Sequence, residues 1–124
     1  MKTSDILSKR FTLALLIAGV LFAGQLPNAK ADYLYWTDAV LGTSSLTNGY
    51  NIAEQTLRRA NASGIRRQST EVAGTISGSY VAIHCVGTAP RVTAIIMVVG
   101  PNQSDVVRVR DAVRTGMMKI KLID

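Results

Sequence analysis

Apolar residues repeat with the period of a β-strand in three segments of this chain of 124 residues. The aromatic-rich segment Tyr33–Val40 lies between an aspartate and a glycine, which is typical of a first strand. Two further runs, Tyr80–Val86 and Val92–Val99, are joined by a short turn over 87–90 that contains Gly and Pro. This pair of runs predicts a β-hairpin.

A helical period replaces the strand period after Ser44. Apolar residues there are spaced alternately by four and three positions, which places them on one face of an α-helix. They are Leu46, Tyr50, Ala53, Leu57 and Ala60. Arg58 and Arg59 fall in the last turns, where the helix dipole favours cations, and Gly64 is the predicted stop.

A second helix is predicted after Gly100-Pro101, which ends the preceding strand. Asn102 or Ser104 can cap its first turn. The helix runs to about Thr115, and Gly116 fits a C-terminal cap. Its inner face carries Val106, Val109 and Val113.

The remaining segments complete the predicted fold. The polar, glycine-containing segment 65–78 predicts an additional strand, and the tail Met117–Asp124 alternates apolar residues with lysines, as a closing edge strand does. The element order indicates an α+β fold of the ferredoxin-like, split βαβ type. We therefore expect an antiparallel sheet with two helices on one face and an additional strand in 65–78.

Both faces of the predicted strand Val92–Val99 are apolar. A sheet that is covered on one side only normally alternates apolar and polar positions. We therefore expect a cover on the second face. It is either a second copy of the chain, in a homodimer through the open sheet face, or the segment 65–78.

The first 31 residues have the organisation of a cleavable signal peptide. Lys2, Lys9 and Arg10 form a basic start, the uncharged apolar run Phe11–Gly24 follows, and Ala29-Lys30-Ala31 offers a cleavage site. As a helix, 14 residues span about 21 Å of a bilayer core that is about 30 Å thick. This disfavours a membrane span, and an uncleaved anchor or a buried helix stays as an alternative.

Removing residues 1–31 leaves a single predicted domain over 32–124 and changes its charge. The chain has 14 Lys and Arg and 8 Asp and Glu residues, and four of the former and one of the latter lie within 1–31. The remaining 10 basic and 7 acidic residues give a net charge of +3, which is no argument for nucleic acid. We expect a periplasmic or secreted protein with no transmembrane span after cleavage and no nucleic-acid partner.

No catalytic, metal-binding or nucleotide-binding motif stands out. Cys85, the only cysteine, cannot form an internal disulfide, and it follows His84, the only histidine. Successive side chains of a strand point to opposite faces, so the two cannot bond directly as nucleophile and base unless the strand is bulged there. Cys85 is expected in the core and His84 in a structural role, with a general base or metal ligand as its alternative. We therefore expect no cofactor, no metal site and no enzymatic activity.

Arginines form the densest charge feature of the predicted domain. Arg58, Arg59, Arg66 and Arg67 can make a patch for an acidic polymer, a lipid headgroup or an acidic partner, or they are simply solvated. A small-ligand or anion binder would use Arg66, Arg67 or Arg91 around a pocket at the sheet. With His84, these arginines are the candidate binding residues.

The run EVAGTISGSYVAIHCVGTAPRVTAIIMVVGP, with the later VRVRDAV, resembles small exported bacterial proteins that carry no assigned activity. The likeness covers about residues 58–124. It implies a compact exported domain in a bacterial envelope and supplies no catalytic residue. The leading hypothesis is a non-enzymatic interaction domain that binds itself or another envelope component, and a small-ligand or anion binder is the alternative.

Overall fold

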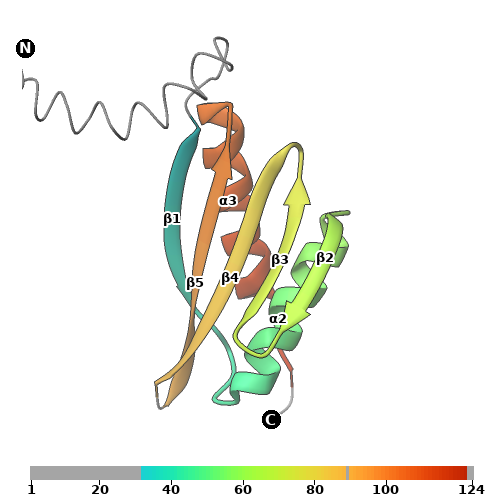
Figure 1. Ribbon diagram of the computed structural model, residues 1–124. Coiled ribbons are helices and arrows are strands. Elements are labelled where there is room, and N and C mark those ends of the chain that lie inside the picture. Colours follow the sequence, from blue (N-terminus) through green and yellow to red (C-terminus); the bar gives the residue numbers. More distant parts are fainter. Residues whose placement is uncertain (1–31, 89, 123–124) are drawn as a thin grey trace, which may run out of the picture. The chain divides into compact units, whose positions relative to one another are not determined.

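The computed structural model of the protein describes residues 32–88 and 90–122, and these form an α+β fold (Figure 1). Five strands make one antiparallel sheet, and two helices cover one of its faces. The elements in chain order are β1 (Tyr33–Val40), α2 (Leu46–Arg59), β2 (Ser63–Gln68), β3 (Glu71–Ile76), β4 (Ser79–Thr88), β5 (Arg91–Gly100) and α3 (Gln103–Lys119). The predicted signal peptide over 1–31 lies outside the described residues.

The strand order across the sheet is β1-β5-β4-β3-β2, so the first strand lies at an edge beside the last one. The chain passes from β1 through α2 to the opposite edge and returns through three successive hairpins. A ferredoxin-like chain runs β-α-β-β-α-β, whereas here four strands follow α2. The α+β class is confirmed, and the ferredoxin-like arrangement is not.

The predicted closing strand over Met117–Asp124 is wrong within the described residues, because α3 continues to Lys119. Met117 and Ile120 are buried three positions apart, as on one face of a helix, whereas Met118 is exposed. The strand prediction was wrong because it placed Met118 in the core, whereas this side chain is exposed.

Two predicted helix ends are also wrong. The first helix, α2, ends at Arg59 and not near Gly64, because the chain turns at Asn61, whose φ is 58°. The second, α3, does not end at Gly116, which lies inside the helix. A Cβ at Gly116 would lie 3.1 Å from Thr56 Cγ2. Glycine therefore permits a close contact between the two helices at this position.

Both helices begin at a side-chain cap. Ser45 Oγ accepts a hydrogen bond from the Asn48 amide at 3.2 Å, and Asn102 Oδ1 accepts one from the Asp105 amide at 3.0 Å. These bonds satisfy amides that the first helical turn leaves without a partner. The predicted cap at Asn102 is confirmed.

The segment 65–78 contributes to two strands of the sheet, most of β2 and all of β3. The turn from β3 to β4 is Ser77-Gly78, where both residues have positive φ, as a tight two-residue hairpin turn requires. Because both strands lie within the sheet, this segment does not fold over β5. The explanation that 65–78 shields the second apolar face is therefore wrong.

The core lies between the sheet and the two helices. Inward-facing strand residues are buried there, among them Val72, Val81, Ile83, Cys85, Val92, Ala94, Ile96 and Val98. The helices add Ile52, Ala53, Leu57, Val106, Val109, Val113 and Met117. Gly49 lets α2 approach the sheet closely, since a Cβ there would lie 2.9 Å from Val92 Cγ1.

Candidate binding surfaces

The sheet face turned away from the helices is uncovered by any helix or strand in the described ranges, and we call it the open face (Figure 1). Its main residues are Leu34, Trp36, Asp38 and Val40 on β1, Thr93, Ile95, Met97 and Val99 on β5, and Tyr80, Ala82, His84 and Val86 on β4. Nine large apolar residues of the described chain are exposed, and six of them lie on this face. The exposed apolar surface is therefore concentrated and not scattered.

Side chains of the open face form continuous rows across β1, β5 and β4. Trp36 pairs with Met97, and Met97 pairs with Ala82. Leu34 and Val99 form part of the neighbouring row. Directly paired side chains have Cβ atoms about 4.5–5.5 Å apart, so adjacent rows make one apolar surface.

The apolar part of the open face is large for an exposed patch. Its three strands, β1, β5 and β4, cover about 14 by 31 Å, or about 430 Å². A standard interface buries about 800 Å² on each partner. Contiguous exposed apolar patches above a few hundred Å² are uncommon on monomers and often mark a binding surface.

The part of this face over β3 and β2 is polar and internally bonded. Arg66 Nη2 donates to Tyr80 Oη at 2.8 Å, and the Tyr80 hydroxyl donates to Glu71 Oε2 at 3.4 Å. Ala73, which pairs with Arg66 on the same face, is fully buried. The apolar portion available to a partner is therefore the part over β1, β5 and β4.

His84 and Cys85 lie on opposite faces of β4, so they form no catalytic pair. Cys85 is in the core, as predicted, and burial raises the pKa of its thiol to about 11. The Tyr50 hydroxyl accepts a hydrogen bond from the Cys85 amide and donates one to its carbonyl. His84 is half-buried on the open face, and its Nδ1 donates to the Thr70 carbonyl at 2.6 Å. Both residues therefore have structural partners.

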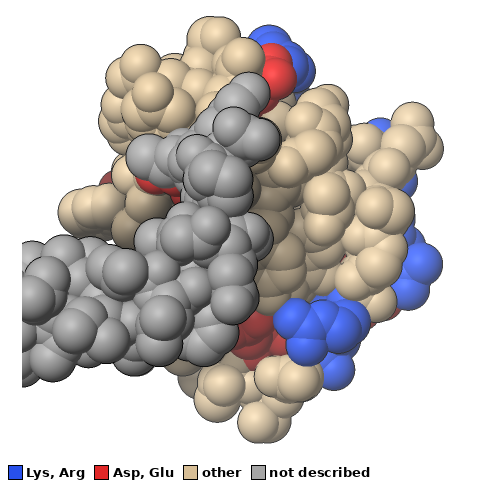
Figure 2. Space-filling view, turned by 45° about the horizontal axis from the view of Figure 1, so that its top comes forward, with Lys and Arg blue, Asp and Glu red and all other residues tan. Residues whose placement is uncertain are grey.

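The candidate arginines do not form a single patch. Figure 2 shows basic side chains at several separate places with uncharged surface between them. Arg66 and Arg67 are neighbours on β2, and Arg66 bonds on the open face while Arg67 bonds to α2. Arg91 lies at the start of β5, beside a surface hollow with Thr43 and Ser44. Arg66, Arg67 and Arg91 therefore lie in different surroundings, and a small-ligand or anion site at any of them stays a prediction.

Two of the arginines share one carboxylate. Arg58 Nη2 lies 2.6 Å from Glu54 Oε2, and Arg67 Nη1 lies 3.2 Å from Glu54 Oε1. These hydrogen bonds hold the pKa of Glu54 below its ordinary value. Arg58 and Arg67 thus join α2 and β2 to a common acid.

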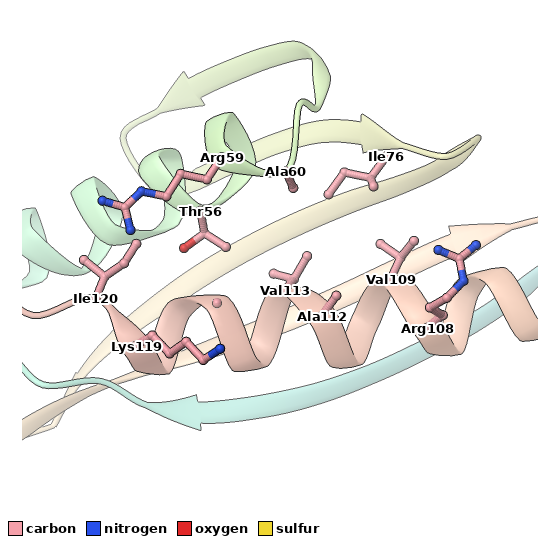
Figure 3. A pocket seen from close by; sticks show the side chains of 11 residues that line it. Thr56, Arg59, Ala60, Ile76, Arg108, Val109, Ala112, Val113, Lys119 and Ile120 are labelled. Carbon is pink, nitrogen blue, oxygen red and sulfur yellow. The ribbon is translucent and has the colours of Figure 1, made fainter.

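Arg59 alone of the candidates lines a groove between α2 and α3, which we call the interhelical groove (Figure 3). Its volume is about 320 Å³. Val109 and Val113 lie along its apolar floor, and Arg108 and Lys119 join Arg59 among the lining residues. Sequence reasoning missed this site because it placed Lys119 on a strand.

No protein-family model, curated protein or solved structure matches this chain. The likeness to small exported proteins stays a prediction, and the function is inferred from the two surfaces above.

Within 32–88 and 90–122, no three His, Cys, Asp or Glu side chains form a group that could hold a metal ion. None of the helices described in the structure is long and apolar enough to cross a membrane.

Proposed function

We propose that the protein is an exported, non-enzymatic domain that associates with a second copy of itself through the open face. The observation that carries this proposal is Trp36, which is 62% exposed at the β1 end of an apolar row. An aromatic side chain buries about 150–250 Å², and tryptophan is enriched among the residues that dominate binding energy. Among the side chains of the open face, Trp36 is therefore expected to contribute most to the free energy of association when it is buried.

The open face suits a second copy because it is self-complementary about a two-fold axis along β5. Such an axis places β1 of one copy against β4 of the other. The strands of the two sheets then run in similar directions, as in aligned face-to-face sheet packing. Trp36 then lies over Ala82 of the partner subunit, where the side chain is short. The same axis brings Asp38 opposite His84 of the partner subunit.

The pairing of Asp38 with the partner's His84 supports this choice of axis. His84 Nδ1 is occupied by the Thr70 carbonyl, so the Nε2 atom is the one left to face the Asp38 carboxylate. The same axis also brings apolar side chains of the neighbouring row together, with Val40 over Val86 of the partner subunit. The one acid and the one histidine of the apolar portion thereby meet each other.

Sedimentation equilibrium of the purified protein, with a matched pair of variants, tests the proposal. Met97 and Met118 are 39% and 45% exposed, and only Met97 lies on the open face. We expect a dimer for the unchanged protein and for Met118→Glu. We expect Met97→Glu to weaken the dimer by more than about 100-fold, because each copy would bury a carboxylate in apolar surroundings.

Thermal melting of both variants serves as the control for folding. A monomer at every concentration of the unchanged protein contradicts self-association. Equal dimerisation of Met97→Glu and Met118→Glu contradicts the open face as the surface through which the copies associate. In either case the open face would serve another partner or none.

Export is tested separately by the N-terminus of the protein in cells. Mass spectrometry of the envelope fraction is expected to find a chain that begins at Asp32. An intact Met1 on soluble cytosolic protein would contradict the export proposal and leave the dimer proposal untouched.

A further inference from the structure

We propose that the interhelical groove binds a single-chain anionic amphiphile, with an acyl chain on its apolar floor and a carboxylate head at Arg59 and Lys119. This proposal goes beyond self-association and does not depend on it. The groove lies on the helix side of the sheet, and the open face lies on the other side (Figures 1 and 3).

The floor of the groove offers contact to an apolar chain. Val109 and Val113 are buried at its base. Thr56 also lines it, but the Thr56 hydroxyl donates to the Ile52 carbonyl at 2.8 Å. Its methyl group Cγ2 faces Gly116. The one hydroxyl in the lining is therefore already bonded, and the floor suits a methylene chain.

The size of the groove selects one chain. Its volume of about 320 Å³ lies at the lower end of the roughly 300–1,000 Å³ of small-molecule sites. This size favours a single short chain over a two-chain lipid. The small residues Ala112 and Gly116 keep the space open on the α3 side.

The charges around the groove select an anion. Its lining contains three cations, Arg59, Arg108 and Lys119, and no Asp or Glu. Arg108 is bonded to Asp105. Within residues 32–88 and 90–122, the side chains of Arg59 and Lys119 have no hydrogen bond or ion pair.

Figure 3 shows Arg59 and Lys119 toward the same end of the groove, one from each helix, with Arg108 at the other end. A guanidinium presents two parallel donors to a carboxylate, and an ammonium adds a point charge. An anionic head at that end leaves the chain to run along the floor toward Val109. A peptide segment fits less well, because its backbone amides would find no partners on an apolar floor.

Titration calorimetry and amide NMR with decanoate, below its micelle concentration, test this proposal. We expect saturable binding with one decanoate per chain, and amide shifts centred on Ala112 and Gly116. Decanol and decyltrimethylammonium carry the same chain without the negative charge, and they are expected to bind at least about tenfold more weakly. Acetate, which has the charge without the chain, is expected to give no saturable binding.

Neighbouring arginines supply the matched variants. Arg59→Gln is expected to weaken decanoate binding about tenfold, the value of a charge-assisted hydrogen bond. Arg58→Gln removes the same charge one residue away, where the side chain is bonded to Glu54 outside the groove, and is expected to bind as the unchanged protein does. Ala112→Leu fills the groove without changing charge and is expected to abolish binding.

Three results would overturn the proposal. They are equal affinity for decanoate and decanol, equal binding by the Arg58 and Arg59 variants, and amide shifts centred on Met97 instead of Gly116. The last result would mean that decanoate adsorbs to the open face. Thermal melts of all three variants establish that each is folded, so a loss of binding reports on the groove.

Discussion

The two faces of β5 carry nearly the same kinds of side chain but differ in what covers them. On β5, Ile96 lies in the core beneath the helices, and its neighbour Ile95 lies half-buried on the open face. The residue types are identical, so composition does not distinguish the covered face from the uncovered one. The difference teaches that the position of the helices, and not the apolarity of the strand, decides which face becomes core.

Charge separates the two candidate binding surfaces in a second way. The interhelical groove combines an apolar floor with unpaired cations, whereas the apolar portion of the open face carries one acid, Asp38, and one histidine, His84. A concave apolar site with cations on its lining suits a small anionic amphiphile. A broad and nearly uncharged sheet face suits another sheet. Each prediction below tests whether the two sides of the sheet differ as described.

The largest expected effect comes from shortening the same residue type on each face. Ile96→Ala is expected to lower the free energy of unfolding by about 2–5 kcal/mol, because it leaves a cavity in the packed core. Ile95→Ala is expected to cost less than about 1 kcal/mol in the monomer. Urea unfolding measures both, with Met97→Glu as the background so that dimerisation does not contribute. Equal losses would mean that the open face is buried within a single copy.

An effect of intermediate size is expected from the Cys85 thiol at alkaline pH. Burial raises its pKa to about 11, above the ordinary value of about 8.5. The unfolded chain therefore releases this proton at a lower pH than the folded protein does. The stabilisation is complete below about pH 8.5 and is lost as pH rises toward 11, by about 3 kcal/mol in full.

Urea unfolding between pH 7 and 10.5 measures this loss. Cys85→Ala is the control, because it removes the titrating group and keeps the other residues. The unchanged protein should lose more stability over this range than the variant does. Parallel curves for the two proteins would show that Cys85 is not shielded from water in the core.

The smallest effect is expected from the two neighbouring arginines of β2. Arg67 donates to Asn51 at 2.6 Å and to Glu54 at 3.2 Å, whereas Arg66 donates to Tyr80 on the other face. Arg67→Gln is expected to cost up to about 1 kcal/mol, as partly exposed ion pairs do. It should also raise the pKa of Glu54 toward its ordinary value.

Carboxyl NMR titration of Glu54 measures the second effect, and Arg66→Gln is the matched control. The lowered pKa of Glu54 stabilises the fold above the ordinary pKa of a glutamate, and this contribution is lost as pH falls through the folded value. Arg67→Gln should reduce the acid-dependent part of stability, and Arg66→Gln should leave it unchanged. The same pKa of Glu54 in both variants would contradict the ion pair between Arg67 of β2 and Glu54 of α2.

Local patterns predicted much of the fold. Segment Tyr33–Val40 forms β1, the hairpin over 80–99 forms β4 and β5, and Asn102 caps α3. The end of α3 was not predictable in this way, because Met117 and Ile120 fit the core only after α3 packs on the sheet. The role of Gly116 depends likewise on Thr56, a residue of the other helix.

The sequence by itself determined the α+β class, the apolar nature of both sides of β5 and the opposite directions of His84 and Cys85. Each of these depends on residue types a few positions apart, so the period of the backbone is enough to decide them. Only the tertiary structure decided the strand order, the side on which the helices lie and the placement of Arg59 and Lys119 toward one end of the interhelical groove. These features depend on contacts between residues distant in the chain, where burial of apolar surface and close packing choose among arrangements that local patterns leave equal.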